Sequence, residues 1–452
     1  MAGMQFEFTT GPGRKAAQAE RREEGPLRIL LLGDFSGLPA GERTPLAQRK
    51  TCKVDIDNFD NLLARLAPRA TLAAGSVQFA NIDDFHPDAL YQRLPLFQAL
   101  REARSQPPSA ASDLLGGLLG GNAAPAASTS SKPASPLDTL IRSVVAPHIL
   151  PDTTSETRAY TAAVDAAIAE QMRAVLHDPA FQSLEANWRG VQWLLRELEL
   201  DENLQLHLFD VTRDELLADI VNAGGQLAQS GLHAALADRW RSAPDGEPWS
   251  LLAGLYKFGP SDLDIGLLAA LGLIASQAGG PFIAAGDMAL VGEEDDATLN
   301  GWRALRRSQA APWIGLTAPR LLLRLPYGKG SDAIESFAFE ELGSGEPEHE
   351  HLLWGAGSLG ATLLIGRAFA ASGWDFSPGD ERELGDLPAW VFTRDGEREL
   401  QACAERYLGE TAATALLEAG LMPLLSHRNS NAVTLLRFQS ISEPASALAG
   451  LG

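Results

Sequence analysis

The sequence has only two cysteines among its 452 residues, Cys52 and Cys403. Two thiols so far apart form no disulfide framework, and they are too few to build a zinc site by themselves. We therefore expect both to be reduced structural thiols, as is usual for a protein of the cytosol.

Long apolar runs are absent as well. No uninterrupted hydrophobic stretch approaches the roughly 20 residues that cross a bilayer, and no apolar signal core follows the basic N-terminus before Gly25. These absences predict a cytoplasmic protein with no direct membrane insertion.

Positive charge is scarce. The chain carries 37 Lys and Arg against 58 Asp and Glu, which gives a formal net charge of −21. A surface of this sign repels phosphate backbones and anionic lipid headgroups. Nucleic acid and membrane surfaces are therefore not expected as partners.

What is present indicates a folded protein, since hydrophobic residues make up 45% of the chain and charged residues 21%. Strand-like and helix-like segments alternate, which predicts an α/β protein: a smaller α/β module packed on a larger α/β domain with a mixed sheet. The predicted regions are an N-terminal tail or strand (1–25), the smaller module (26–105), a flexible linker rich in Pro, Ala, Gly and Ser (106–136), and the larger domain (137–452).

Several local patterns predict individual elements. The run Leu27–Leu32 is typical of a strand buried on both faces. Pro87 suits the first position of a helix, and Pro95 ends that helix and opens the next one. The sequence from Thr212 to Glu215 is a capping box that opens a further helix.

One pattern points toward nucleotide chemistry. The run Gly355-Ala-Gly357-Ser-Leu-Gly360 has the spacing of a dinucleotide-binding turn, and Asp375 or Asp380 lies about 20 residues downstream. The preceding strand would be very short, however, and no second strand follows. Small residues where a helix meets a sheet explain the glycines equally well.

Two clusters of titratable residues could be functional sites, but each also has a purely structural interpretation. The acidic residues around His86 resemble acid–base groups, but carboxylates at a helix start also cap free N–H groups. His349 and His351 could hold a metal, yet they lie in a polar run with no third ligand. With no catalytic motif found, we predict no catalytic residues, cofactor or metal, and a protein that is not an enzyme.

Aromatic and arginine residues are the candidates for protein interfaces, because such side chains make most interface hot spots. The alternative is that the tryptophans fill local cores and the arginines are solvated. Phe6 and Phe8 share one face of an alternating stretch that suits an edge strand, or else belong to a disordered leader. The full candidate set is Phe6, Phe8, Trp188, Arg189, Trp193, Trp302, Arg306, Arg320, Arg324 and Tyr327.

Longer motifs resemble known proteins. The module 26–105 resembles the small subunit of the contractile sheath of bacterial type VI secretion, the TssB/VipA family. The matching motifs are Leu30–Gly37, Val54–Phe59, Leu63–Pro68 and Asn81–Phe97. The domain 137–452 resembles the large subunit, the TssC/VipB family, through Ala146–His148, Met172–Gly190, Trp302–Arg307, Pro319–Gly328, Phe337–Glu341, Leu353–Gly355 and Gly373–Trp374.

The resemblance implies a sheath-like structural protein in which the two parts interlock. In that family the subunits stack around an inner tube and contract, and a ClpV-type ATPase recycles them. Three departures from the family pattern lead us to expect an accessory that caps, nucleates or connects the sheath. The small-subunit part stops near Arg104, the segment that usually carries the ATPase recognition helix is short, and the sequence ends at Gly452, before the strands that bind neighbouring protomers.

Two other functions stay open: a genuine protomer that polymerises around the tube, or a nucleotide-binding enzyme. The partners that the resemblance implies are sheath subunits, inner-tube or baseplate proteins, and the ClpV-type ATPase.

Overall fold

A computed structural model describes residues 25–105, 156–243, 246–292, 297–342, 349–394 and 396–451. Two compact units are distinguished by their internal contacts. One comprises Met1–Leu62, Ala186–Arg324 and Leu353–Gly452, and the other Leu63–Glu185 and Leu325–Leu352. Each unit therefore draws residues from both of the regions that the sequence separates, 26–105 and 137–452. We call these regions the N-terminal and C-terminal segments.

The first unit is organised around a mixed sheet, which has nine strands within the described residues. In spatial order the strands are β11 (Glu383–Leu384), β15 (Val433–Leu435), β14 (Leu421–Ser426), β8 (Ile314–Ala318), β7 (Phe282–Gly286), β6 (Leu251–Phe258), β1 (Leu27–Gly33), β5 (Leu204–Asp210) and β2 (Cys52–Val54). The run from β5 to β14 is parallel, and antiparallel strands complete both edges.

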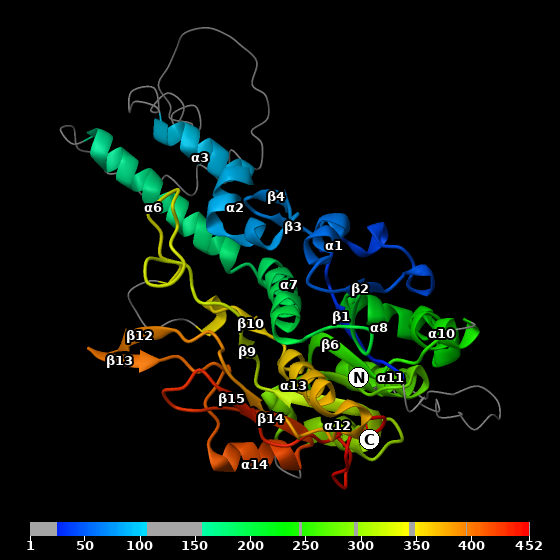
Figure 1. Cartoon of the computed structure of the whole chain (residues 1–452). Helices are drawn as coiled ribbons and strands as arrows, with labels where there is room; N and C mark the ends of the chain where they lie inside the picture. The colour runs from blue at the N-terminus through cyan, green and yellow to red at the C-terminus, as the bar shows by residue number, and fades with distance from the viewer. Residues whose placement is uncertain are drawn as a thin grey trace. The chain divides into compact units, whose positions relative to one another are not determined.

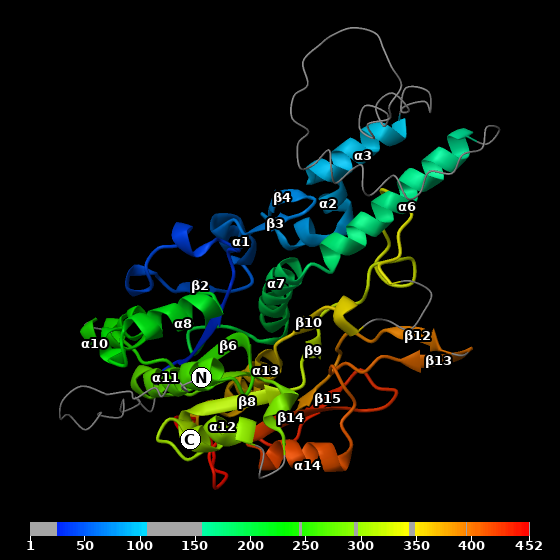
Figure 2. The ribbon, with the colours of Figure 1, turned by 180° about the vertical axis from the view of Figure 1, so that it is seen from behind.

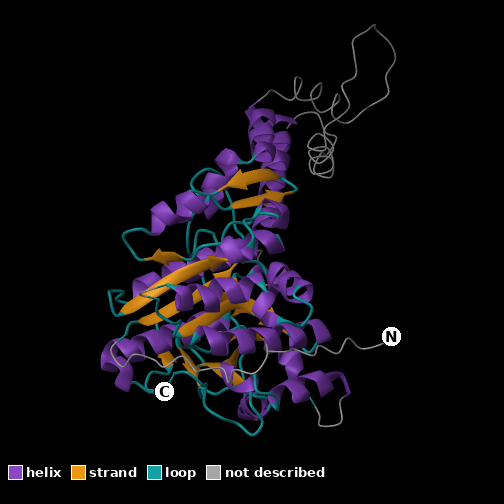
Figure 3. Ribbon diagram, turned by 90° about the vertical axis from the view of Figure 1, so that its right-hand side faces the viewer, coloured by secondary structure: helices purple, strands orange, loops and turns teal. Residues whose placement is uncertain are grey.

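Helices cover both faces of this sheet (Figure 3). The helices of the first unit are α8 (Arg213–Asn222), α9 (Gly231–His233), α10 (Arg239–Ser242), α11 (Asp262–Ala278), α12 (Asn300–Arg306), α13 (Gly357–Ser372) and α14 (Glu410–Glu418). On one face, Leu30 and Leu316 of the strands share a core cluster with residues of α8, α11 and α12. On the other face α13 lies against the sheet, because its Gly357 approaches Thr317, the neighbour of Leu316 that points the opposite way.

Two small antiparallel strand pairs accompany the main sheet. β9 (Leu321–Leu322) pairs with β10 (Trp354–Gly355), although a long stretch of sequence separates them, and β12 (Val391–Arg394) forms a hairpin with β13 (Glu397–Leu400). This hairpin is drawn in orange in Figure 2.

The second unit is smaller. It contains the hairpin of β3 (Arg69–Leu72) and β4 (Gly75–Gln78), and the helices α2 (Pro87–Arg93), α3 (Pro95–Ser105) and α6 (Glu156–Leu176). Its core includes Phe79 stacked on Phe85 at 4.0 Å, with Phe181 at the edge of both rings. Helices α1 (Phe59–Leu66) and α7 (Pro179–Glu197) each contain residues of both units.

The α/β class and the mixed sheet predicted from the sequence are confirmed. The capping box at Thr212 and Glu215 opens α8, and Pro87 and Pro95 begin α2 and α3 as predicted. One feature was not predicted: the N-terminal segment does not keep its main strand to itself. Its strand β1 lies inside the large sheet, between two strands of the C-terminal segment (Figure 1).

No helix among the described residues is both long enough and apolar enough to cross a membrane.

Candidate functional site

The site that the structure singles out is the internal interface of the first unit, where the N-terminal segment enters the sheet of the C-terminal segment. β1 pairs with β5 over seven residues, from Leu27 with Leu204 to Gly33 with Asp210. On its other side it pairs with β6, starting at Ile29 and Leu251. Both neighbours are parallel to β1, so its backbone groups are used on both edges.

The sequence of β1 explains why it occupies an interior position. The strand is LRILLLG, and Leu27 and the run Ile29–Leu32 are fully buried. A strand that is apolar on both faces must be covered on both faces, which a parallel strand in the middle of a sheet achieves. Burial of each leucine side chain contributes roughly 1.5–3 kcal/mol.

Beyond the carboxyl ends of β1 and β5 lies a buried ion network that again joins the two segments. The guanidinium of Arg43, whose side chain is 1% exposed, lies 2.5 Å from Asp34, 3.0 Å from Asp210 and 3.5 Å from Glu215. Arg49 contacts Glu215 at 2.7 Å and also donates to the Asp210 carbonyl at 2.6 Å. Two cations of the N-terminal segment thus meet two carboxylates of the C-terminal segment.

Hydrogen bonds hold the carboxylates of this network in place. Asp210 accepts from the backbone N–H groups of Phe35 and Ser36 at 2.8 and 3.1 Å, and from the Ser36 hydroxyl at 2.7 Å. Burial by itself raises the pKa of Glu215, but hydrogen bonds from Arg49 and the Thr212 backbone hold that pKa below its usual value. Glu215 is therefore ionised at neutral pH.

Trp188 is the third contact between the segments. Its Nε1 donates to the Phe35 carbonyl at 2.9 Å, and its ring meets Phe35 and Phe59 edge-on at 5.6 and 5.9 Å. The adjacent Asn187 donates to the Asp34 carbonyl at 3.0 Å. Helix α7 is therefore joined to the backbone that follows β1 by two hydrogen bonds, one from an indole N–H and one from a side-chain amide.

The other interface candidates are distributed over both units. Trp302 is 2% exposed and lies in the core cluster beneath the sheet. Arg306 donates to the carbonyls of Ile441 and Glu418 at 3.0 and 2.7 Å. Arg320 forms a two-pronged pair with Glu405 at 2.9 and 2.7 Å.

Tyr327 and Arg324 are buried as well, with 2% and 8% exposure. In the second unit, the Tyr327 backbone N–H donates to Glu341 at 2.7 Å. Arg189 and Trp193 are half-buried on α7. Phe6 and Phe8 lie outside the described residues, as does the predicted linker.

Sequence reasoning missed Arg43, Arg49 and Asp210. Asp34 is only nine residues from Arg43, but the partners of both arginines in the C-terminal segment, Asp210 and Glu215, lie more than 160 residues away along the chain. No local spacing could reveal that part of the network. Asp34 does lie within the motif Leu30–Gly37 on which the family resemblance was based, and that motif was the one available signal.

The glycine-rich run has a packing explanation. A Cβ at Gly357 would come within 2.8 Å of Leu424 and 2.9 Å of the Pro319 carbonyl, and a Cβ at Gly360 would come within 2.7 Å of Leu384. Ser358 is fully buried and donates to the Gly254 carbonyl at 2.8 Å. These glycines therefore allow α13 to pack closely against the sheet and its neighbours.

The carboxylates near His86 serve as caps and loop ties within the second unit. Asp84 completes a capping box with Asn81. Asp88 accepts from the backbone N–H groups of Glu335 and Ser336 at 3.1 and 2.9 Å. Burial by itself raises the pKa of Asp88, but these two bonds hold it below its usual value.

The pair His349 and His351 lies in a short 3-10 helix, and His351 stacks on His177 at 3.9 Å. In the part of the chain that the structure describes, no group of three or more His, Cys, Asp or Glu side chains is arranged to hold a metal ion.

Comparison with known proteins gives two family matches. A family model described as "EvpB/VC_A0108, tail sheath N-terminal domain" (VipB) matches residues 158–442. A second model, described as "Type VI secretion system, VipA, VC_A0107 or Hcp2", matches residues 14–117. The two matches fall on the C-terminal and N-terminal segments, respectively.

Two curated relatives from Pseudomonas aeruginosa agree with this division. The type VI secretion system sheath protein TssC1 is 32% identical over 304 residues, which cover 63% of this chain and 61% of TssC1. The type VI secretion system sheath protein TssB1 is 30% identical over 99 residues, which cover 20% of this chain and 58% of TssB1. The chain thus spans about three fifths of the length of each relative.

Proposed function

Since this chain belongs to the VipB family of tail-sheath N-terminal domains, we propose that it is a structural component of a type VI secretion contractile apparatus. In this proposal one polypeptide supplies both the small-subunit-like and the large-subunit-like part. The observation that carries the proposal is the position of β1, which pairs over seven residues with β5 and is bordered by β6 on its other side.

We propose further that the protein is an accessory that caps, nucleates or connects a sheath. Its own β1 already fills the place between β5 and β6, so a separate small subunit has no strand position left there. Every copy also carries the stretch 106–136, rich in Pro, Ala, Gly and Ser. A tightly repeated lattice would have to accommodate that stretch at each step, whereas a component present in few copies would not.

The alternative is a genuine protomer that polymerises around the inner tube. Electron microscopy of the purified protein separates the two functions. We expect particles of one or a few copies, and long striated tubes from the protein alone would establish the protomer instead. A fluorescent fusion should then mark one end of a sheath rather than its whole length.

The partners in this proposal are sheath subunits and inner-tube or baseplate proteins, and the location is the cytoplasm. Recycling by a ClpV-type ATPase is tested by adding that ATPase to a complex of this protein with sheath subunits. The measurement is whether this protein is released from the sheath subunits. The remaining candidate, a nucleotide-binding enzyme, predicts a thermal shift with millimolar NAD or ATP. The packing around Gly357 leads us to expect none.

We assign two roles to the three predicted interface residues of α7. Trp188 serves the internal interface, because its bonds join α7 to Phe35 of the N-terminal segment. Arg189 and Trp193, half-buried on the same helix, are the candidates for contact with another component.

A further inference from the structure

One carboxylate of the internal interface, that of Asp210, is held by the same kinds of donor that proteins use to bind free anions. Its Oδ1 accepts the backbone N–H groups of Phe35 and Ser36 at 2.8 and 3.1 Å. Its Oδ2 accepts the Ser36 hydroxyl at 2.7 Å and lies 3.0 Å from the guanidinium of Arg43. Adjacent backbone N–H groups combined with a guanidinium form a concave site that is suited to carboxylate and phosphate.

The donors and the carboxylate come from different segments of the chain. All the donors belong to the N-terminal segment, and Asp210 lies more than 160 residues further along the sequence. The donors are also withdrawn from water, since Phe35 and Ser36 are 0% and 2% exposed and the Arg43 side chain is 1% exposed. Donors buried to this extent destabilise the fold when they have no acceptor. The site therefore needs an anion to fill it.

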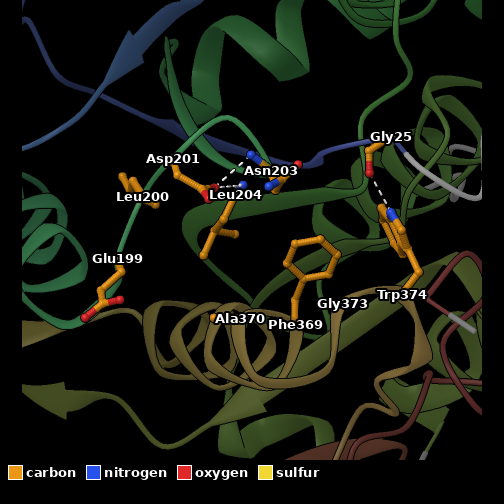
Figure 4. A pocket seen from close by; sticks show the side chains of 10 residues that line it. All are labelled: Gly25, Glu199, Leu200, Asp201, Asn203, Leu204, Phe369, Ala370, Gly373 and Trp374. Atoms are coloured by element: carbon orange, nitrogen blue, oxygen red, sulfur yellow. Dashed lines mark hydrogen bonds between the residues drawn. The ribbon is translucent and has the colours of Figure 1, made fainter.

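Asp201, at the opposite end of β5, shows a different arrangement. Its carboxylate accepts the backbone N–H groups of Asn203 and Leu204, both at 2.7 Å (Figure 4). These donors are the residues that follow it almost directly in the sequence, and Asp201 is exposed. Asp201 therefore closes a local turn, whereas Asp210 joins two distant parts of the chain.

We propose that Phe35, Ser36 and Arg43 form an anion receptor, and that the Asp210 carboxylate is the ligand built into it. Asp210 pairs with Gly33, the last residue of β1. The surface that the N-terminal segment presents at this point thus fits a strand that runs parallel to β1 and ends in an acidic residue. The proposal rests on the contacts of the internal interface and does not depend on the sheath assignment.

Binding of formate to the D210A variant tests the anion receptor. The substitution deletes only the carboxylate group, and formate supplies the same group as a free ion. The full chain is unfolded with urea at pH 7 in increasing sodium formate, with sodium chloride added to keep the ionic strength constant. An ion that binds only the folded chain raises the folding equilibrium constant by the factor 1 + [L]/Kd, which is about elevenfold when [L] is about ten times Kd. We expect a saturating rise of this kind for D210A and none for wild type, in which Asp210 fills the receptor.

Three further variants locate the binding. D210N fills the same volume with an uncharged amide, so it should lose stability without responding to formate. D201A is the matched control, because it also removes a carboxylate that accepts two backbone N–H groups, but from an exposed position. It should respond no more than wild type. Adding S36A to D210A removes a hydroxyl donor and should raise the Kd for formate about tenfold or more, as expected for a hydrogen bond to a charged group.

Equal responses of D210A, D201A and wild type would overturn the anion receptor, because formate would then act on the protein surface as a whole. A response of D210N equal to that of D210A, or an unchanged Kd in the variant with S36A, would place the binding elsewhere and contradict the proposal as well. If D210A does not fold in chloride, formate should restore its native elution volume and far-UV circular dichroism. The absence of any recovery in formate would then refute the proposal.

Discussion

Replacing Arg43 with methionine tests the internal interface at its most buried charge. Methionine keeps much of the side-chain length but removes the guanidinium, which lies between 2.5 and 3.5 Å from Asp34, Asp210 and Glu215. The carboxylates then remain at the ends of β1 and β5 with one fewer cation to balance them.

The magnitude follows from the exposure of the partners. Removing one partner of a buried ion pair costs about 3–5 kcal/mol, because the other charge stays buried and uncompensated. The side chains of Asp34, Asp210 and Glu215 are 33%, 17% and 11% exposed, so water relieves part of that cost at Asp34. Arg49 still pairs with Glu215 at 2.7 Å. We therefore expect a loss near the lower end of the range, about 3 kcal/mol.

The assay is urea unfolding of the full chain at pH 7, followed by tryptophan fluorescence, since Trp188 bonds to the Phe35 carbonyl close to the network. The matched control is R307M. Arg307 also contacts a carboxylate, Glu443 at 2.9 Å, but the two side chains are 64% and 36% exposed. An exposed pair of this kind contributes about 0–1 kcal/mol.

The difference between wild type and R43M should also depend on pH. The pKa of Glu215 is lowered in the folded state from its usual 4.5, so its ionised form stabilises the fold above that value. This contribution is lost as the pH falls through the lower folded pKa. The difference in the free energy of unfolding between wild type and R43M should therefore become smaller in acid, because a protonated carboxyl group has no charge for the guanidinium to balance. A loss at pH 7 no larger than that of R307M would refute the reasoning.

Three further predictions concern packing, protonation and chain connectivity. G357A should lower the free energy of unfolding by about 1–3 kcal/mol, because its Cβ would meet Leu424 at 2.8 Å. G385A, which meets nothing within 4 Å, is the control, and equal urea midpoints would count against the close-packing explanation. Burial lowers the pKa of His207 from 6.5 to about 4, so the unfolded chain takes up a proton first and stability should fall by at most about 3 kcal/mol between those pH values. H207Q should flatten this pH profile, and a variant as pH-sensitive as wild type would disprove the assignment. Protease cleavage within 106–136 should leave the two halves eluting together, since β1 pairs with both β5 and β6; separate elution would contradict the shared sheet.

The sequence by itself determined the elements whose signals are local. The capping box at Thr212, the prolines that open α2 and α3, and the doubly apolar run of β1 are each read from a few consecutive residues. The ordered motifs that resemble the two sheath subunits are local in the same sense, and the family comparisons agree with them.

Only the tertiary structure decided which strands are neighbours and which charges meet. The residues of β1, Leu27–Gly33, do not indicate that β5, more than 170 residues later, is the strand that pairs with it. Any strand can form the same backbone hydrogen bonds, so the pairing cannot be predicted from the local sequence. Arg43 gives no hint of Asp210 for the same reason. The glycines of α13 showed the converse: their spacing fits a nucleotide-binding turn, and the side chains packed against them, distant in sequence, reveal that they serve close packing.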